Sequence, residues 1–153
     1  MKLVSLRKIN HEDRDIILFW RNDPEIISYG TTQNAVSQDE HNTWFAESLL
    51  SNYRLIFIIE YNNKPIGQIR FDKTRNSLVH CFISIYLFSH KNMGIGTKIL
   101  KNGIELMCED WNAIKIIVAE VLTKNINSQK FFQKNGFILK DKSSSRIIYH
   151  LNL

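Results

Sequence analysis

Apolar and polar residues follow two periodicities along this chain, and each periodicity predicts a different kind of element. Runs of strand length that alternate or are continuously apolar predict β-strands. The strands expected on this ground are residues 3–6, 53–61, 65–71, 78–88, 116–122, 137–139 and 146–151. Apolar residues spaced three and four apart predict amphipathic helices. The helices expected are residues 11–21, 37–50, 94–111 and 125–135, with a short turn of helix opened by Asp23 and Pro24.

The order of these elements predicts one mixed α/β domain over residues 1–153. The three runs between residues 53 and 88 are long and joined by short polar breaks, which is typical of antiparallel hairpins. The run 116–122 is apolar except for Glu120, so we expect a central strand there. The fold class expected is therefore α/β, with a central, mostly antiparallel, twisted sheet of about seven strands flanked by four helices on its two faces.

The size and composition of the chain fit a single globular domain with a scattered positive charge. Its 153 residues are 44% hydrophobic, which is enough for a sizeable core. Lys and Arg number 20 against 15 Asp and Glu, a net charge of +5, but the basic residues are not clustered. A scattered surplus favours an anionic ligand over a nucleic acid, so we expect no nucleic-acid partner.

The cysteines and the lengths of the apolar runs indicate the cellular compartment in which the protein is expected. Cys81 and Cys108 lie in apolar segments without metal-ligand spacing, so we expect free buried thiols and no metal. Runs such as 55–59 are far shorter than a membrane span, and residues 1–7 lack the apolar block of a signal peptide. These features favour a reducing, cytoplasmic compartment and no membrane partner.

The loop at the start of the helix expected over 94–111 is a candidate anion site. Two glycines at the mouth of a helix let backbone N–H groups close around a phosphate, and the helix dipole adds partial positive charge. The spacing is neither that of a P-loop nor that of a Rossmann fingerprint. A tight turn followed by a helix cap is the alternative interpretation. The loop consists of Lys91, Asn92, Met93, Gly94, Ile95, Gly96 and Thr97.

A second motif follows the strand that carries Glu120. It is made of Asn125, Ser128, Phe132, Gly136 and Phe137. Together with the glycine loop, this motif resembles the signature of the GNAT superfamily of acetyl-CoA-dependent N-acetyltransferases. The two motifs occur in the family's order and at its usual separation, and the resemblance covers nearly the whole chain. Two positions depart from the family pattern, because Lys91 stands where Gln or Arg is usual and Phe132 where Tyr is usual.

The resemblance implies how the chain holds acetyl-CoA. Backbone groups of residues 84–86 would pair with the pantetheine arm, and one N–H there would polarise the thioester carbonyl. The amides of residues 92–97 would hold the pyrophosphate. Asn125 would hydrogen-bond the pantetheine, and a helix N-cap is the alternative role for this residue. The cofactor-binding residues expected are Ser84, Ile85, Tyr86, Lys91, Asn92, Met93, Gly94, Ile95, Gly96, Thr97, Asn125 and Phe132.

The resemblance also implies catalytic groups. Glu120 matches the position of a carboxylate that some members of the family use as a base to deprotonate the amine. A carboxylate held in a salt bridge is the alternative interpretation of Glu120. Members of the family with a tyrosine at the Phe132 position are taken to use it to protonate the departing thiolate. Here that proton would come from water or from a nearby hydroxyl, such as that of Tyr86 or Tyr149.

Residues that contact the acceptor are expected in the N-terminal half. Residues 20–24 and the later His41 resemble a subgroup that acetylates 4-amino sugars carried on UDP and, more loosely, ribosomal-protein N-acetyltransferases. We expect Trp20, Arg21 and His41 to contact the acceptor, because an aromatic ring and a cation suit a nucleobase and a diphosphate. Residues 44–45 are expected in the core.

The resulting hypothesis is a monomeric or homodimeric N-acetyltransferase. A primary amine would attack acetyl-CoA directly in a ternary complex, without a metal or a covalent enzyme intermediate. The leading acceptor is a nucleotide-linked amino sugar, and a protein N-terminus is the alternative acceptor. A GNAT-fold module that binds CoA without turnover is the alternative from another class, and Phe132 is the residue that favours it.

Overall fold

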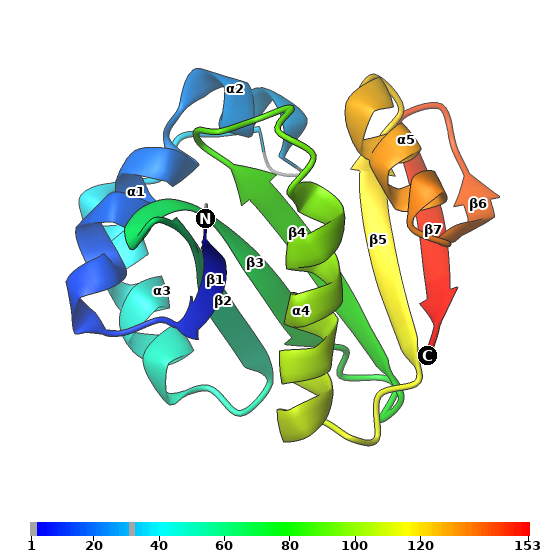
Figure 1. Ribbon diagram of the computed structural model, residues 1–153, viewed down its shortest axis with the longest axis horizontal. Coiled ribbons are helices and arrows are strands. Elements are labelled where there is room, and N and C mark those ends of the chain that lie inside the picture. The colour runs from blue at the N-terminus through cyan, green and yellow to red at the C-terminus, as the bar shows by residue number, and fades with distance from the viewer. Residues whose placement is uncertain (1–2, 31–32) are drawn as a thin grey trace.

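One mixed sheet of seven strands runs through the computed structural model, which describes residues 3–30 and 33–153. The strand order is β1-β2-β3-β4-β5-β7-β6 (Figure 1), and the paired neighbours are antiparallel except β4 and β5, which are parallel. The mostly antiparallel sheet expected from the sequence is confirmed. The strands are β1 (Val4–Lys8), β2 (Arg54–Tyr61), β3 (Lys64–Lys73), β4 (His80–Leu87), β5 (Ile116–Leu122), β6 (Ile138–Lys142) and β7 (Arg146–Asn152).

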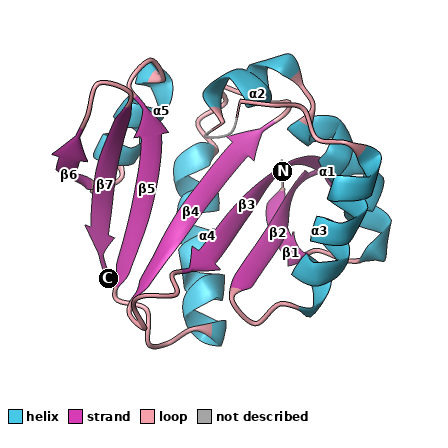
Figure 2. Ribbon diagram, turned by 180° about the vertical axis from the view of Figure 1, so that it is seen from behind, coloured by secondary structure: helices cyan, strands magenta, loops and turns pink. Residues whose placement is uncertain are grey.

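Five α-helices surround this sheet in the described part of the chain, the four expected and α2. Helix α2 lies where Asp23 and Pro24 predicted a short helical turn, and the Asp23 carboxylate accepts hydrogen bonds from the backbone N–H groups of Glu25 and Ile26. Helices α1 and α3 cover one face of the sheet and α4 and α5 the other, as Figure 1 and Figure 2 show from opposite sides. The helices are α1 (Arg14–Arg21, after a 3-10 turn at His11–Asp13), α2 (Pro24–Tyr29), α3 (Gln38–Leu50), α4 (Gly96–Asp110) and α5 (Ile126–Lys134).

The parallel strands β4 and β5 are paired over only four residue pairs. The last pair is Ile83 opposite Ala119. Beyond it, β4 continues along β3 to Leu87 and β5 continues along β7 to Leu122, so the two strands diverge (Figure 1). The sheet therefore opens towards the carboxyl ends of these two strands, and the facing backbone edges have no partner strand among the described residues.

The two faces of the sheet bury different kinds of side chain. The face under α4 and α5 holds the main apolar core, which draws on β2 to β5 and on β7. On the other face, Ile58 packs with Ile17, Trp20 and Phe45 beneath α1 and α3. Further along β3 this second face becomes polar, because alternation along a strand brings every second residue to the same side. The resulting polar strip consists of Gln68, Arg70 and Asp72, opposite Tyr86, Ser84 and Phe82 on β4.

Both cysteines are free thiols. Cys81 is fully buried, and burial raises the pKa of its thiol to about 12, whereas Cys108 is half-buried. Within residues 3–30 and 33–153, no helix is long and apolar enough to cross a membrane. The same residues contain no group of three or more His, Cys, Asp or Glu side chains that could hold a metal ion.

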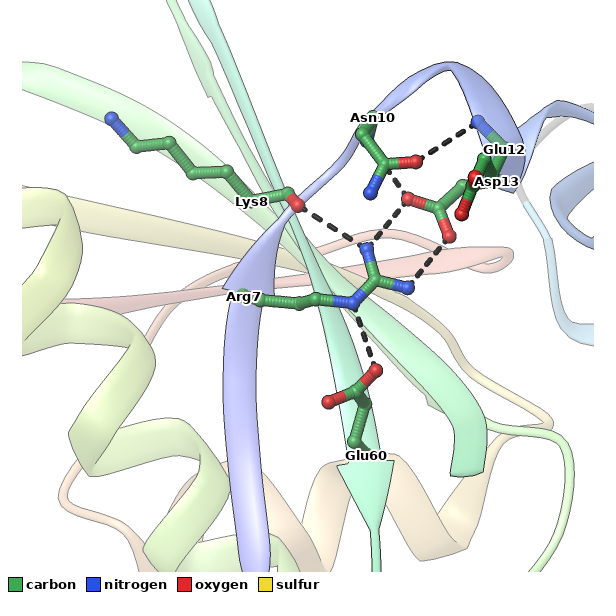
Figure 3. Close-up of polar contacts among 6 residues, drawn as sticks. All are labelled: Arg7, Lys8, Asn10, Glu12, Asp13 and Glu60. Atoms are coloured by element: carbon green, nitrogen blue, oxygen red, sulfur yellow. Dashed lines mark hydrogen bonds and ion pairs between the residues drawn. The ribbon is translucent and has the colours of Figure 1, made fainter. Parts of the chain in front are cut away.

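Arg7 ties the first strand to the first helical turn (Figure 3). Its guanidinium donates two hydrogen bonds of 2.8 Å to the carboxylate of Asp13, which is 3% exposed, and one of 2.8 Å to Glu60 on β2. The Asp13 carboxylate also accepts a hydrogen bond from the N–H of Asn10. The hydrogen bonds to Asp13, partly offset by burial, raise the pKa of Arg7. One permanently charged group thus holds β1, β2 and the start of α1 together.

Arg7→Met should cost stability, because it leaves the buried Asp13 carboxylate without its cation. We expect the free energy of unfolding to fall by about 2 kcal/mol, the cost of stranding a buried charged acceptor. Lys8→Met is the matched control, since the ion pair of Lys8 with Asp110 is exposed and should contribute less than about 1 kcal/mol. Urea denaturation of both variants checks this expectation. Equal losses would mean that the Arg7 network is worth no more than a surface ion pair.

Candidate active site

A large cavity opens at the place where β4 and β5 diverge. Its volume is about 820 Å³, and it is bordered by α2, β3, β4, the loop before α4, β5 and α5. Residues far apart in the sequence meet there because the two strands lead away from each other. The expected site residues that line it are Arg21, Ser84, Ile85, Tyr86, Lys91, Asn92, Met93, Gly94, Ile95, Gly96, Thr97, Glu120, Asn125 and Phe132.

The N-terminus of α4 borders this cavity without a cap. Its N-cap residue, Ile95, makes no side-chain cap hydrogen bond, and the first turn contains no acidic residue. The preceding loop passes through left-handed backbone at Asn92 (φ 61°) and Gly94 (φ 72°). Successive N–H groups in such a turn and at a helix N-terminus converge on anions. The loop is therefore able to hold a phosphate group, and it is also the tight turn and helix start of the alternative interpretation.

Three of the residues expected to bind the cofactor contact other residues of the protein. The Lys91 ammonium lies 2.6 Å from Oε2 of Glu25 on α2, so its charge is partly neutralised. Asn125 Oδ1 accepts a hydrogen bond from the N–H of Ser128, which makes Asn125 the N-cap of α5. Phe132 is 5% exposed and packs edge-on against neighbouring aromatic rings. Its ring therefore belongs both to the cavity wall and to the core.

Glu120 is the first residue of β5 beyond the last pair with β4. Its carboxylate lines the cavity and forms an ion pair with Arg146 on β7. The salt bridge of the alternative interpretation is therefore present, and the position of the carboxylate at the cavity leaves the role as a base a prediction. A carboxylate at this place is the kind of group that can accept a proton from an amine.

Two polar atoms of the cavity wall are buried without a hydrogen-bond partner among the described residues. They are the hydroxyl of Tyr86 on β4 and the side-chain carbonyl oxygen Oε1 of Gln68 on β3. These residues are direct partners across the β3–β4 ladder. Burial raises the pKa of Tyr86, so its hydroxyl keeps its proton at neutral pH. Each unpaired atom costs about 1–3 kcal/mol, so each needs an explanation.

Arg21, at the end of α1, is held by two uncharged rings. Its guanidinium lies 4.4 Å from the centroid of the Trp44 ring, and its Nη1 lies 3.2 Å from Nδ1 of His41. His41 Nε2 donates to the carbonyl oxygen of Arg14 over 2.6 Å, so Nδ1 is left to accept from Arg21. Burial lowers the pKa of His41, which favours this neutral form.

The charge of Arg21 is uncompensated within the described part of the chain, since no carboxylate there lies within ion-pair distance of it. Burial, and then the nearby Arg70, lower the pKa of Arg21. A half-buried cation in this position favours an anion in the cavity.

Two of the residues expected to contact the acceptor are buried and do not line the cavity. Trp20 is 2% exposed and lies in the core between α1, α3 and the sheet. His41 is fully buried and contacts Arg21 through Nδ1. Arg21 alone of the three lines the cavity, and His41 instead orients it. Phe45 is a core residue as expected, whereas Trp44 is only half-buried and forms the platform under Arg21.

The polar strip of β3 contains the functional candidates that the sequence analysis missed. All three of its residues, Gln68, Arg70 and Asp72, line the cavity. The Asp72 carboxylate pairs with Nε of Arg70 at 2.8 Å and with Nε of Arg54 at 2.5 Å. A signal was present, since polar residues at alternate positions of an apolar strand mark one polar face. The pattern alone does not say that this face borders a cavity.

Comparison with known proteins decides the family. Residues 4–138 match the model of a protein family described as an acetyltransferase (GNAT) domain, and this match spans most of the chain. The chain belongs to the GNAT acetyltransferase family. The fold and the enzyme class inferred from the two motifs are those of a GNAT acetyltransferase.

Two proteins similar to this GNAT acetyltransferase, PseH and a spermidine N-acetyltransferase, are each 22% identical to it or less. It is 22% identical to acetyltransferase PseH of Campylobacter jejuni over 153 residues, covering 100% of this chain and 93% of PseH. Spermidine N-acetyltransferase from Vibrio cholerae, in complex with CoA and spermine, superposes with a TM-score of 0.86 at 16% identity, covering 97% of this chain and 95% of that one. Campylobacter jejuni PseH in complex with acetyl coenzyme A superposes with a TM-score of 0.72 at 19% identity, covering 98% and 99%. These structures support the fold alone.

Proposed function

We propose that this enzyme transfers the acetyl group of acetyl-CoA to the primary amine of a nucleotide-linked amino sugar. The observation that carries the acceptor is Arg21, a half-buried cation at the cavity wall whose contacts are a neutral imidazole and an indole ring. A guanidinium placed in this way favours a phosphate or a carboxylate, and the diphosphate of a sugar nucleotide supplies one. The resemblance of residues 20–24 to enzymes of UDP-linked 4-amino sugars supports the same acceptor.

The net charge of the cavity wall favours a phosphate-bearing acceptor over a polyamine. The guanidinium carbons of Arg21, Arg54 and Arg70 lie 4.4, 5.2 and 5.9 Å from the centroid of the Trp44 ring. One carboxylate, that of Asp72, pairs with two of these three cations. The cluster is therefore positive, so it repels a polyamine and attracts a phosphate. A protein N-terminus, the alternative acceptor, brings no diphosphate to this wall.

The other half of the cavity suits acetyl-CoA, which would supply the thioester. We infer that the N–H groups of residues 92–97 hold its pyrophosphate, because the N-terminus of α4 is uncapped and open space surrounds the place of a Cβ at Gly94. The backbone edge of residues 84–86, which has left β5, would hydrogen-bond the pantetheine arm as an added strand. Asn125 and Phe132 would border the arm from the side of α5.

We further infer a direct transfer in a ternary complex. The amine nitrogen forms a bond to the acetyl carbon while the bond between that carbon and sulfur breaks, and Glu120 takes the proton that the amine loses. A backbone N–H of residues 84–86 polarises the thioester carbonyl. Tyr86 gives its proton to the thiolate and regains one from solvent. Tyr149, the other hydroxyl considered, is 1% exposed in the core and does not line the cavity.

Gly94→Val should weaken the binding of CoA, because a branched side chain strains a loop residue at φ 72° and enters the proposed phosphate site. We expect the Kd for CoA to rise by about tenfold or more, a loss of about 1.4 kcal/mol. Gly136→Val is the matched control, since Gly136 also has a positive φ, of 86°, but does not line the cavity. Titration calorimetry measures both, and wild-type affinity in a folded Gly94→Val protein would contradict the cradle.

Arg21→Gln tests the acceptor class. Removing the cation should raise the KM for a UDP-linked 4-amino sugar by at least about tenfold, the usual worth of a charge-assisted hydrogen bond. The KM for acetyl-CoA should not change. Arg14→Gln is the control, because Arg14 lies on the same helix and pairs with Asp15 at the surface. The amino-sugar proposal fails if Arg21→Gln leaves that KM unaltered, or if the wild type prefers spermidine or a peptide N-terminus.

Glu120→Gln tests the base. The substitution keeps the shape of the side chain and removes the proton acceptor, so kcat near neutral pH should fall by about 10²–10⁴. The loss should shrink at high pH, where more of the amine is already deprotonated. Glu105→Gln, on the exposed side of α4, should keep the wild-type kcat. If the pH–rate profiles of Glu120→Gln and the wild type coincide, Glu120 serves only its ion pair with Arg146.

A further inference from the structure

Gln68 is a cavity residue to which the proposed reaction assigns no role. It lies on β3, is 2% exposed and lines the cavity. Its carbonyl oxygen Oε1 is buried and accepts no hydrogen bond from the described residues. Buried side-chain oxygens that serve packing alone usually have a partner. The unpaired acceptor therefore indicates a donor that arrives with a ligand.

The neighbours of Gln68 narrow the identity of that donor. Its partner on β2 is Ile58, which is apolar and fully buried, and its partner on β4 is Tyr86, whose hydroxyl is also unpaired. An amide oxygen can only accept hydrogen bonds, so the arriving group must carry an N–H or O–H. In the proposed arrangement the pantetheine arm of acetyl-CoA hydrogen-bonds the backbone of residues 84–86, so the amine of the acceptor is the donor left for Gln68.

We propose that Oε1 of Gln68 accepts a hydrogen bond from the acceptor amine and so orients it for attack. With one N–H held on β3, the nitrogen lone pair can turn towards β4, where residues 84–86 border the cavity. Gln68 and Tyr86 face each other across the ladder, so the amine and the proton donor for sulfur occupy adjacent strands of one face. This role of Gln68 depends on the acetyltransferase reaction and not on the kind of acceptor.

The position of Arg70 relative to Gln68 indicates how far the amine of the acceptor lies from its phosphate. Gln68 and Arg70 are two residues apart on β3 and project to the same face, so their Cα atoms lie about 7 Å apart. Arg70 and Arg21 belong to the positive cluster that the proposed function assigns to a phosphate, and the distance therefore rests on that proposal. An acceptor that contacts both Gln68 and Arg70 carries its amine about one sugar ring away from its nearest negative charge. The site thus favours an amine on the far side of the ring from the phosphate.

Two substitutions at Gln68 test the amine contact. Gln68→Met keeps the length of the side chain and removes the acceptor, so the KM for the amine should rise by about tenfold or more while the KM for acetyl-CoA stays constant. Gln68→Glu restores an acceptor and should return the KM for the amine to near the wild-type value. The thermal midpoint of Gln68→Met should not fall, since the substitution removes an unpaired buried atom. Gln38→Met, on the exposed surface of α3, should change neither constant.

The outcomes separate a contact from a packing role. An unaltered KM for the amine in Gln68→Met overturns the inference. The inference is also overturned if Gln68→Met and Gln68→Glu both raise the KM for the amine and both lower the thermal midpoint. That pattern means that Gln68 only supports the sheet.

A series of aminoalkyl phosphates tests the distance. Ethanolamine phosphate, aminobutyl phosphate and aminooctyl phosphate present one amine and one phosphate at increasing separation. Aminobutyl phosphate should have the lowest KM with the wild type, and Gln68→Met should remove this preference. Equal KM values for the three compounds, or turnover of none of them by an enzyme that acetylates the sugar nucleotide, overturn the distance.

The proposed function and this inference fail in different ways. Acetylation of the UDP-linked amino sugar with the same KM in wild type and Gln68→Met removes the role of Gln68 and leaves the proposed function standing. A wild type that prefers a peptide N-terminus, together with a higher KM for that peptide in Gln68→Met, keeps the role of Gln68 and removes the amino sugar.

Discussion

The early end of the pairing between β4 and β5 is the constraint on which the site depends. After Ile83 and Ala119, β4 stays with β3 and β5 stays with β7, so the sheet opens while the outer ladders remain intact. Helix α4 follows β4 and α5 follows β5, and the N-termini of both helices therefore come to the same opening. A cavity of about 820 Å³ results, with backbone donors on one side and the polar strip of β3 on the other.

Most charged side chains around this cavity belong to ion pairs, whereas Arg21 and Lys134 have no ion-pair partner among the described residues. Lys91 pairs with Glu25, Glu120 with Arg146, and Asp72 with two arginines. These pairs fix the walls from α2, β7 and β3. Arg21 differs, because it is backed by a neutral histidine and lies over an indole ring. Such an arrangement keeps a cation partly desolvated and oriented, which strengthens its attraction for an anion.

The same wall also carries a cost to stability. Gln68 and Tyr86 bury polar atoms that no described residue satisfies, next to the apolar clusters of the core. Sequences specify one structure best when each buried polar atom has a partner, and exceptions cluster where a ligand completes the set. The Arg7 network differs in both respects, because its residues do not line the cavity and its buried carboxylate is paired.

The sequence by itself determined the elements, the family and the glycine loop before α4, because these rest on local rules. Strand alternation, helical spacing, caps such as Asn125 and the glycine loop are each contained within a few residues. The tertiary structure alone decided which side chains meet. Trp20 and His41 carry the same polar and aromatic chemistry as ligand contacts, yet packing puts both behind the wall. Glu120 meets Arg146, and Gln68 meets Tyr86, because the register of distant strands brings them together. Register is set by the sum of many weak contacts over the whole sheet, and no short stretch of sequence contains that sum.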